Sequence, residues 1–221
     1  MAPATASMKA RLSLGGQKFA KIPDRMPLMN LALRRPMTLA EFLAWEDRQE
    51  LRYEFDGVGP IAMTGGTAAH ATIQRNLAIS VGGRLRGGPC RFYGSDLKIE
   101  VAGRVRYPDG FVVCAPLANT AKVVSDPVVI FEILSESTSS TDRIVKNREY
   151  EATPSVRRYV MLEQDRIAAT VFARVEGDWV GHVILEDAIL AMPEIGQEIP
   201  LAEFYEGLVF EPTEDAEPAD A

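Results

Sequence analysis

The stretch Val128-Val129-Ile130-Phe131-Glu132-Ile133-Leu134 decides the fold class, because these seven residues include a single polar side chain, that of Glu132. A short and nearly continuous apolar run is typical of a central β-strand that is covered on both faces. Such a strand carries the carboxylate of Glu132 into the interior, where an unpaired charge is strongly destabilising. The carboxylate therefore needs a cation, several hydrogen bonds, a metal ion or a proton.

A second acid precedes another apolar segment. Asp109 follows Tyr107-Pro108 and leads into residues 110–114, which carry the pattern of a strand. If this segment pairs with the strand over 128–134, Asp109 and Glu132 meet at one edge of the sheet. Two neighbouring carboxylates repel each other unless a positive charge lies between them.

Two explanations fit such a pair of acids. A Mg²⁺ ion can satisfy both, because it binds one or two carboxylates together with water molecules. In the other explanation, Lys98 or Arg143 neutralises Glu132 in an ordinary buried ion pair. The spacing of the residues in the sequence is compatible with both.

The segments around these two strands alternate between helical and strand patterns. Thr38 and Glu41 form a capping-box pattern ahead of an apolar segment, and residues 68–85 carry apolar side chains at helical spacing. This alternation predicts a mixed α/β fold of the α+β type, with one central mixed sheet flanked by helices. Helices are expected at 38–49, 68–85 and 142–152, and strands at 51–55, 61–63, 92–101, 110–114, 128–134, 159–162, 168–173 and 179–185.

The composition is that of a soluble globular chain: 221 residues, 47% hydrophobic and 25% charged. We expect one domain over residues 37–210. Residues 1–36 carry seven basic side chains against one acidic one and are expected to form a disordered basic extension. Residues 211–221 carry five acids and no base, and are expected to form a disordered acidic tail.

Targeting and cysteine patterns narrow the class of protein further. The sequence has no run of about 18 uncharged apolar residues and no leader-like N-terminus, so we expect a cytoplasmic protein without a membrane partner. Cys90 and Cys114 lie 24 residues apart without a nearby metal-binding partner. This pattern argues against both a disulfide and a zinc site, and two buried thiols are expected.

Several separated motifs, in this order along the chain, resemble the bacterial "putative restriction endonuclease" family within the PD-(D/E)XK nuclease superfamily. The resemblance covers about residues 37–210. It implies a restriction-endonuclease-like core in which Asp109 and Glu132 bind a metal. The motifs are Tyr53-Glu54 ahead of Asp56-Gly57, His70 at the start of the long helix, Tyr107-Pro108-Asp109, Phe131 to Thr138, and Asp142-Arg143 with Lys146 and Tyr150.

The resemblance also implies a set of catalytic residues. Superfamily members usually carry a lysine two residues after the glutamate, where this chain has Leu134. Lys146, on the following helix, matches the lysine that the family offers instead, and Lys98 is a second candidate. Glu54 matches an acid that precedes the core and is a third candidate metal ligand. Two of these residues also have an interpretation without a catalytic role. Lys146 would then be a solvated residue on the surface of its helix, and Glu54 an exposed residue on an edge strand.

These residues favour a metal-dependent endonuclease that hydrolyses phosphodiester bonds, most simply in DNA, with Mg²⁺ or Mn²⁺ as its cofactor. The alternative is a catalytically degenerate nuclease-fold protein that binds nucleic acid or a protein partner without cleavage. Leu134 and the net charge of −7 support this alternative. The strands from Tyr159 onward could also form the interface of a homodimer. For His70 a structural role is favoured over a zinc site.

Overall fold

The structure is a computed structural model that describes residues 35–63, 65–134 and 140–210. The basic N-terminal segment, apart from its last two residues, lies outside the described residues, as does the acidic tail. Residues 135–138 of the glutamate-containing motif also lie outside them. The account below concerns the compact unit that begins at Pro36.

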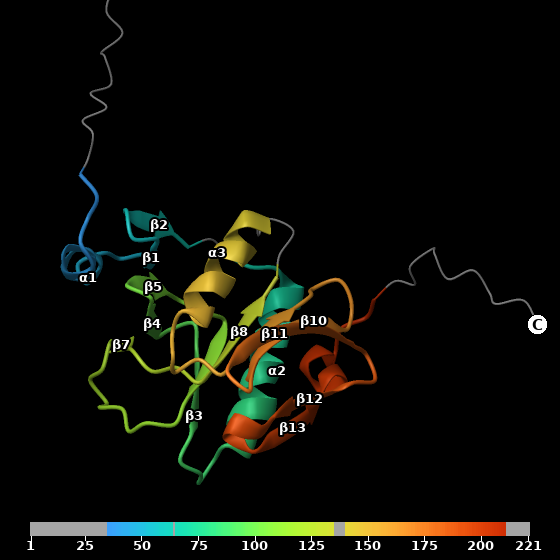
Figure 1. The fold of residues 1–221 in the computed structure, drawn as a ribbon. Helices are drawn as coiled ribbons and strands as arrows, with labels where there is room; N and C mark the ends of the chain where they lie inside the picture. Colours follow the sequence, from blue (N-terminus) through green and yellow to red (C-terminus); the bar gives the residue numbers. More distant parts are fainter. Residues whose placement is uncertain (1–34, 64, 135–139, 211–221) are drawn as a thin grey trace, which may run out of the picture. The chain divides into compact units, whose positions relative to one another are not determined.

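The larger sheet has six strands and contains the stretch that decides the fold class (Figure 1). Strand β8 (Val129–Ile133) lies inside it, parallel to β9 (Arg158–Leu162) and antiparallel to β6 (Gly110–Val113). The remaining strands are β3 (Arg91–Gly94), which pairs with β6, and β10 (Ala168–Val175) and β11 (Asp178–Leu185), which extend the sheet beyond β9. All five residues of β8 are buried, as its apolar run predicts.

A second sheet of five strands corrects the expectation of a single central sheet. Its order is β2 (Pro60–Ala62), β1 (Tyr53–Phe55), β5 (Arg104–Arg106), β4 (Lys98–Val101) and β7 (Val123–Val124). Strands β5 and β7 are very short, and β5 carries two arginines, so neither has a recognisable strand pattern. A tight turn at Ala102-Gly103, both with positive φ, returns the chain from β4 into β5.

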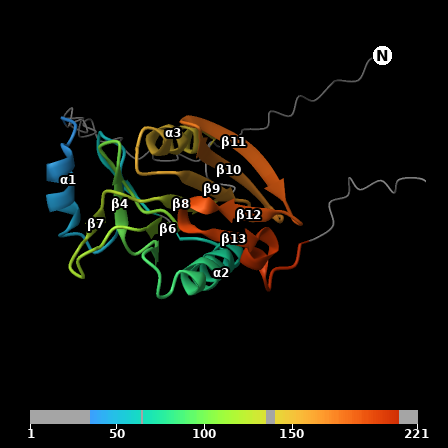
Figure 2. The same cartoon turned by 60° about the horizontal axis from the view of Figure 1, so that its bottom comes forward.

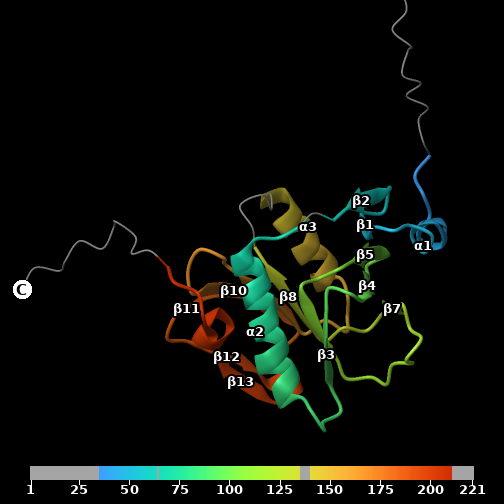
Figure 3. The same ribbon diagram turned by 180° about the vertical axis from the view of Figure 1, so that it is seen from behind.

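Three α-helices are described. Helix α1 (Leu39–Glu46) begins with the expected capping box between Thr38 and Glu41. Helix α2 (Ala68–Arg84) is capped by the Thr67 hydroxyl, and α3 (Ser140–Glu151) follows β8. Helices α2 and α3 lie on opposite sides of the six-stranded sheet (Figures 2 and 3). The chain closes with a hairpin and two short 3₁₀ segments, β12 (Ile189–Met192), η1 (Pro193–Ile195), β13 (Gln197–Pro200) and η2 (Leu201–Tyr205).

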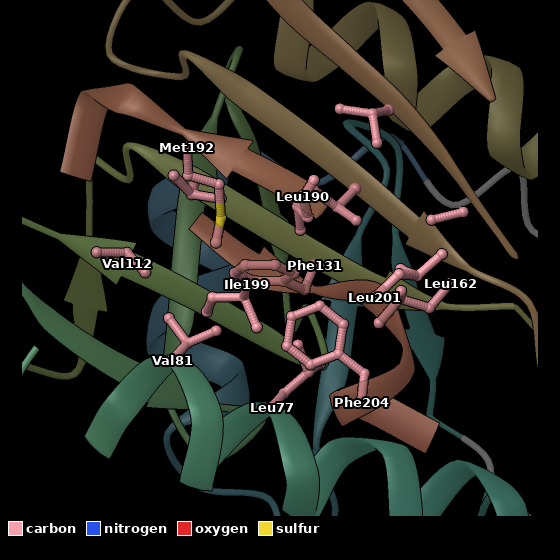
Figure 4. Packing of buried hydrophobic residues seen from close by; sticks show 14 of the residues in the cluster. Leu77, Val81, Val112, Phe131, Leu162, Leu190, Met192, Ile199, Leu201 and Phe204 are labelled. Atoms are coloured by element: carbon pink, nitrogen blue, oxygen red, sulfur yellow. The ribbon is translucent and has the colours of Figure 1, made fainter. Parts of the chain in front are cut away.

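The alternating side chains of β8 place a different hydrophobic core on each face of the sheet. Phe131 packs with Leu77 of α2 and Phe204 of η2 on one face (Figure 4). Ile130 packs with Tyr150 of α3 on the other face. Two covered faces explain why β8 is apolar along its whole length rather than at every second residue.

The two cysteines form a disulfide, so the expectation of two buried thiols is wrong. Strands β3 and β6 are antiparallel, with Arg91 opposite Val113. The next pair in this register is Cys90 and Cys114. Sequence spacing alone could not reveal this contact, because it depends on which strands pair.

None of the helices in the described part of the chain combines the length and apolar character that a bilayer crossing requires.

Phe131 supports a test of this core. Its side chain is fully buried and contacts the rings of Phe92 and Phe204. Phe131→Ala should lower the free energy of unfolding by about 3–5 kcal/mol, because it removes buried apolar surface and leaves a cavity. Urea denaturation measures this loss. Ile79→Ala, at an exposed position of α2, is the control and should change stability by at most about 0.5 kcal/mol. Equal losses in the two variants would contradict the described packing.

Candidate active site

The register of two strands brings Asp109 and Glu132 together. Gly110 of β6 lies opposite Phe131 of β8, so Asp109, one residue earlier, faces the position of Glu132, one residue later. The carboxylate Oδ2 of Asp109 accepts a hydrogen bond from the backbone N–H of Ile133, with an N···O distance of 2.7 Å. The two acids therefore meet at one end of the strand pair, as expected from the sequence.

Asp109 is also held by helix α2. Its Oδ1 lies 3.1 Å from Nε2 of His70, which occupies the first turn of that helix. The hydrogen bond to Asp109 raises the pKa of His70 above its ordinary value, while partial burial opposes the shift. The imidazole thus orients a carboxylate, which agrees with the structural role expected for it.

Helix α3 supplies the partners of Glu132. Lys146 Nζ lies 3.2 Å from Oε1 of Glu132, and the Tyr150 hydroxyl donates a hydrogen bond of 2.9 Å to the same oxygen. Lys146 and Tyr150 are four residues apart, so both side chains lie on one face of the helix. Lys146, rather than Lys98 or Arg143, therefore forms the ion pair with Glu132.

The environment of Glu132 disfavours its negative charge despite these two partners. Burial, together with the charges of Asp109 and Glu54, raises the pKa of Glu132 to about 7. The ammonium of Lys146 and the hydroxyl of Tyr150 act in the opposite direction. Because burial is the largest of these influences, Glu132 accepts a proton more readily than an exposed glutamate does.

Glu54 reaches the same place from the five-stranded sheet. One of its oxygens accepts a hydrogen bond of 3.1 Å from the backbone N–H of Tyr107 and lies 3.8 Å from Nζ of Lys146. The other oxygen lies 3.2 Å from the guanidinium of Arg106. Lys146 therefore lies within ion-pair distance of both Glu54 and Glu132. Glu54 is therefore not an exposed strand residue, because only 13% of its side chain is exposed.

A second ion pair supports this cluster, and sequence reasoning missed it. Arg106 is 2% exposed and donates two hydrogen bonds of 2.8 Å to the carboxylate of Glu149 on α3. Arg104 lies 3.3 Å from the same carboxylate. Because these arginines belong to β5, the pair joins the five-stranded sheet to α3. The sequence does carry one signal for this ion pair, because Arg106 directly precedes the Tyr107-Pro108-Asp109 motif.

Lys98 lies outside the cluster. Its ammonium is buried against the carboxylate of Glu46 on α1, which also accepts a hydrogen bond of 2.7 Å from the Tyr107 hydroxyl. Four of the five residues expected from the sequence are therefore brought together, namely Asp109, Glu132, Lys146 and Glu54.

The donor set suits a hard cation better than a soft one. No group of three or more His, Cys, Asp or Glu side chains close enough to hold a metal occurs among the described residues. Mg²⁺ does not require such a group, because it is commonly held by one or two carboxylates with water completing its coordination. Asp109 and Glu132 provide two carboxylates at the same end of the strand pair.

Comparison with known proteins identifies the family. Residues 39–202 match the Uma2 family, which carries the description "Putative restriction endonuclease". The chain belongs to this family. An uncharacterized protein of Synechocystis sp., slr1290, is 30% identical over 174 residues, which cover 77% of this chain and 92% of that protein. A second protein of this organism, sll1609, is 25% identical over 142 residues, 62% of this chain and 80% of its own length.

A solved structure supports the same fold. A protein from Anabaena variabilis, described as a putative nuclease belonging to DUF820, superposes with a TM-score of 0.64 at 18% identity. The match covers 77% of this chain and 98% of that one. The restriction endonuclease family and the mixed α+β nuclease fold expected from the sequence are thus confirmed.

The raised pKa of Glu132 predicts a pH effect on stability. An unfolded glutamate releases its proton near pH 4.5, but the folded chain retains this proton up to about pH 7. The wild-type chain therefore loses stability through this window as the pH rises. Glu132→Gln removes this loss, so the variant should gain about 2 kcal/mol relative to wild type between pH 5 and pH 8.

Urea denaturation in EDTA at both pH values measures this gain. Glu186→Gln, at an exposed position, is the control and should follow the wild-type curve. A stability difference between wild type and Glu132→Gln that stays the same at pH 5 and pH 8 would show that Glu132 has an ordinary pKa.

Proposed function

We propose that this protein is a metal-dependent endonuclease that hydrolyses phosphodiester bonds in DNA. The observation that carries the proposal is the placement of Asp109 and Glu132 side by side, with Lys146 in contact with Glu132. Membership of a restriction endonuclease family supports the same chemistry. The acids and the lysine are the residue types that metal-assisted phosphodiester hydrolysis requires.

The proposed cofactor is Mg²⁺ or Mn²⁺, held directly by Asp109 and Glu132, with Glu54 binding the ion through a water molecule. Such an ion lowers the pKa of a bound water molecule and neutralises charge on phosphate oxygens. The carboxylates match this role in chemical type, because hard divalent cations prefer oxygen ligands.

The residues around the acids hold them in position. His70 and the backbone N–H of Ile133 fix the two oxygens of Asp109, and Tyr150 fixes an oxygen of Glu132. These bonds lower the freedom of groups that must be placed accurately for catalysis. Lys146 contributes an ammonium that can stabilise the negative charge developing on the phosphate oxygens. Lys98 is the weaker candidate for this role, because its ammonium is paired with Glu46.

Nicking of supercoiled plasmid tests the proposal. The wild-type chain should convert plasmid to the open-circular form with Mg²⁺ or Mn²⁺ and should be inactive in EDTA. Asp109→Asn and Glu132→Gln should reduce the rate to background. Lys146→Met should reduce it about 100-fold, because it removes one charge-stabilising donor. Asp187→Asn, an exposed acid outside the site, is the matched control and should cut at the wild-type rate.

Calorimetry with Mn²⁺ separates the proposal from the alternative of a nuclease fold that binds without cutting. The proposal expects heat of binding in the wild-type chain that the Asp109→Asn, Glu132→Gln double variant loses. If the wild-type chain neither binds Mn²⁺ nor cuts plasmid, the result would favour the catalytically degenerate protein. Leu134, at the usual position of the lysine, also supports that alternative. Equal cutting by wild type and double variant would indicate a contaminating nuclease.

The proposal includes a homodimer formed through strand β11. This strand is an edge of the six-stranded sheet, and its outer backbone is unpaired among the described residues. Val180, Val183 and Leu185 are 45%, 64% and 60% exposed on it. A long edge strand with exposed apolar side chains is a template for pairing with another strand. A second copy of β11 across a two-fold axis would cover it.

Light scattering of the purified protein tests the dimer. We expect twice the chain mass for wild type at micromolar concentration and the mass of one chain for Val183→Lys, because a charge at this edge opposes pairing. Ile79→Lys places the same charge at an exposed position of α2 and should leave the dimer intact. A monomeric wild-type chain, or a dimeric Val183→Lys chain, would contradict this arrangement.

A further inference from the structure

A groove runs along helix α2, and one of its lining residues, Gln74, bonds the backbone of Asp109 in the candidate active site. Gln74, Ala78, Gly82 and Arg86 line one of its sides, and Phe92, Gly94, Ser95 and Asp96 line the other. These residues belong to α2, to the turn after it, to β3 and to the turn that follows β3. The main hollow has a volume of about 460 Å³. We call this feature the α2–β3 groove.

The helix side of the groove begins at Gln74, one helical turn after His70 of the candidate active site. His70, Gln74, Ala78 and Gly82 follow one another at intervals of four residues and therefore form one row along the helix surface. From His70 to Gly82 this row is about 18 Å long, which equals the rise of about five nucleotides in one strand. Because His70 contacts Asp109, the row connects the proposed catalytic acids to the far end of the groove.

Gln74 joins the groove directly to the acids. Its side-chain Nε2 donates hydrogen bonds of 3.2 Å to the backbone carbonyl of Asp109 and 3.0 Å to the hydroxyl of Ser95. These contacts place the near end of the groove beside the first residue of the catalytic pair. A ligand in the groove would thus be continuous with a phosphate bound at the acids.

The far end of the groove is positively charged. A second hollow of about 260 Å³ continues the groove past Arg86 to Arg91, and the two hollows share Gly82, Arg86 and Phe92. Within the described chain, neither arginine has a carboxylate partner. Arg91 donates hydrogen bonds only to backbone carbonyls. The one acid in the groove, Asp96, is ion-paired with Arg52.

The middle of the groove is lined by small residues and one aromatic ring. Ala78, Gly82 and Gly94 are small, and the half-buried ring of Phe92 lies over Gly110, where a Cβ atom would come within 2.6 Å of the ring. A partly exposed aromatic ring and small residues, with cations at one end and polar amide and hydroxyl groups at the other, match a nucleotide chain, which combines base faces that stack on rings with anionic phosphates.

We propose that the α2–β3 groove binds the DNA strand on one side of the cleaved phosphodiester bond, with Arg86 and Arg91 contacting its phosphates. This inference rests on the proposed function, because it takes the acids as the place of cleavage. Arg86 and Arg91 are positioning residues. They hold the strand more than about five nucleotides from the reacting phosphate, because both lie beyond Gly82, and they take no part in the chemistry.

Fluorescence anisotropy with a labelled 20-nucleotide single strand and a 20-base-pair duplex tests the groove. The measurements use the full chain in EDTA, where no cleavage is expected. Ala78→Trp should fill the groove and weaken binding at least about 10-fold. Arg86→Glu should weaken it similarly, and Arg86→Ala should lower the dependence of log K on log salt by about one unit. Arg91→Ala should give the same change in salt dependence.

Two control variants carry matched changes away from the groove. Ile79→Trp adds the same ring at an exposed position of α2, and Arg48→Glu reverses an exposed charge after α1. Both should bind the probes with wild-type affinity. Circular dichroism melting of every variant checks the fold, and Ala78→Trp should melt like the wild type because Ala78 is exposed.

The outcomes separate the groove from the proposed function. Asp109→Asn should bind the probes at least as tightly as wild type, although it does not cut. Binding that depends on the groove in a wild-type chain that never cuts would refute the nuclease and support the groove. Cutting by Ala78→Trp and Arg86→Glu with unchanged KM and unchanged probe affinity would overturn the groove. A change of oligomeric state in these variants, with unchanged DNA binding, would assign the groove to a second copy of the chain and overturn the proposal.

Discussion

The burial of a carboxylate in the middle of a sheet is the constraint on which the rest of the structure depends. Glu132 is 8% exposed within a strand that is otherwise apolar, and burial makes its charge unfavourable. Helix α3 must therefore pack where Lys146 and Tyr150 reach this carboxylate. The position of α3 over the sheet is determined by charge as well as by hydrophobic packing, because breaking a buried pair leaves an uncompensated ion.

A second buried pair extends this constraint to the smaller sheet. Arg106 bonds Glu149 of α3 and also Glu54 of β1. Removal of one partner from such a pair commonly costs about 3–5 kcal/mol. The two sheets and α3 thus meet around alternating positive and negative side chains, and the candidate active site lies at this junction. The same contacts that assemble the fold also place the acids and the lysine.

The sequence predicts the parts of this arrangement that depend on local patterns, and it misses those that depend on pairing. The apolar run of β8 and the capping box at Thr38 each carry their own signal, and both are confirmed. Strand β5 has three residues and no apolar alternation, so the second sheet was not foreseeable. Lys98 is a second candidate beside Lys146 in the sequence, and only the fold shows that its ammonium is paired with Glu46.

The disulfide has a consequence for the geometry of the acids. Cys114 lies five residues from Asp109 along β6, about 16 Å away, and it is bonded to the residue that precedes β3. A slip of one residue between paired strands would turn their side chains to the opposite faces of the sheet. The disulfide joins β3 and β6 at one end of the strand pair and so prevents such a slip at the other end, where Asp109 lies. In a reducing compartment the alignment of Asp109 would depend on the hydrogen bonds between the strands and on its contacts with His70 and Gln74 of α2.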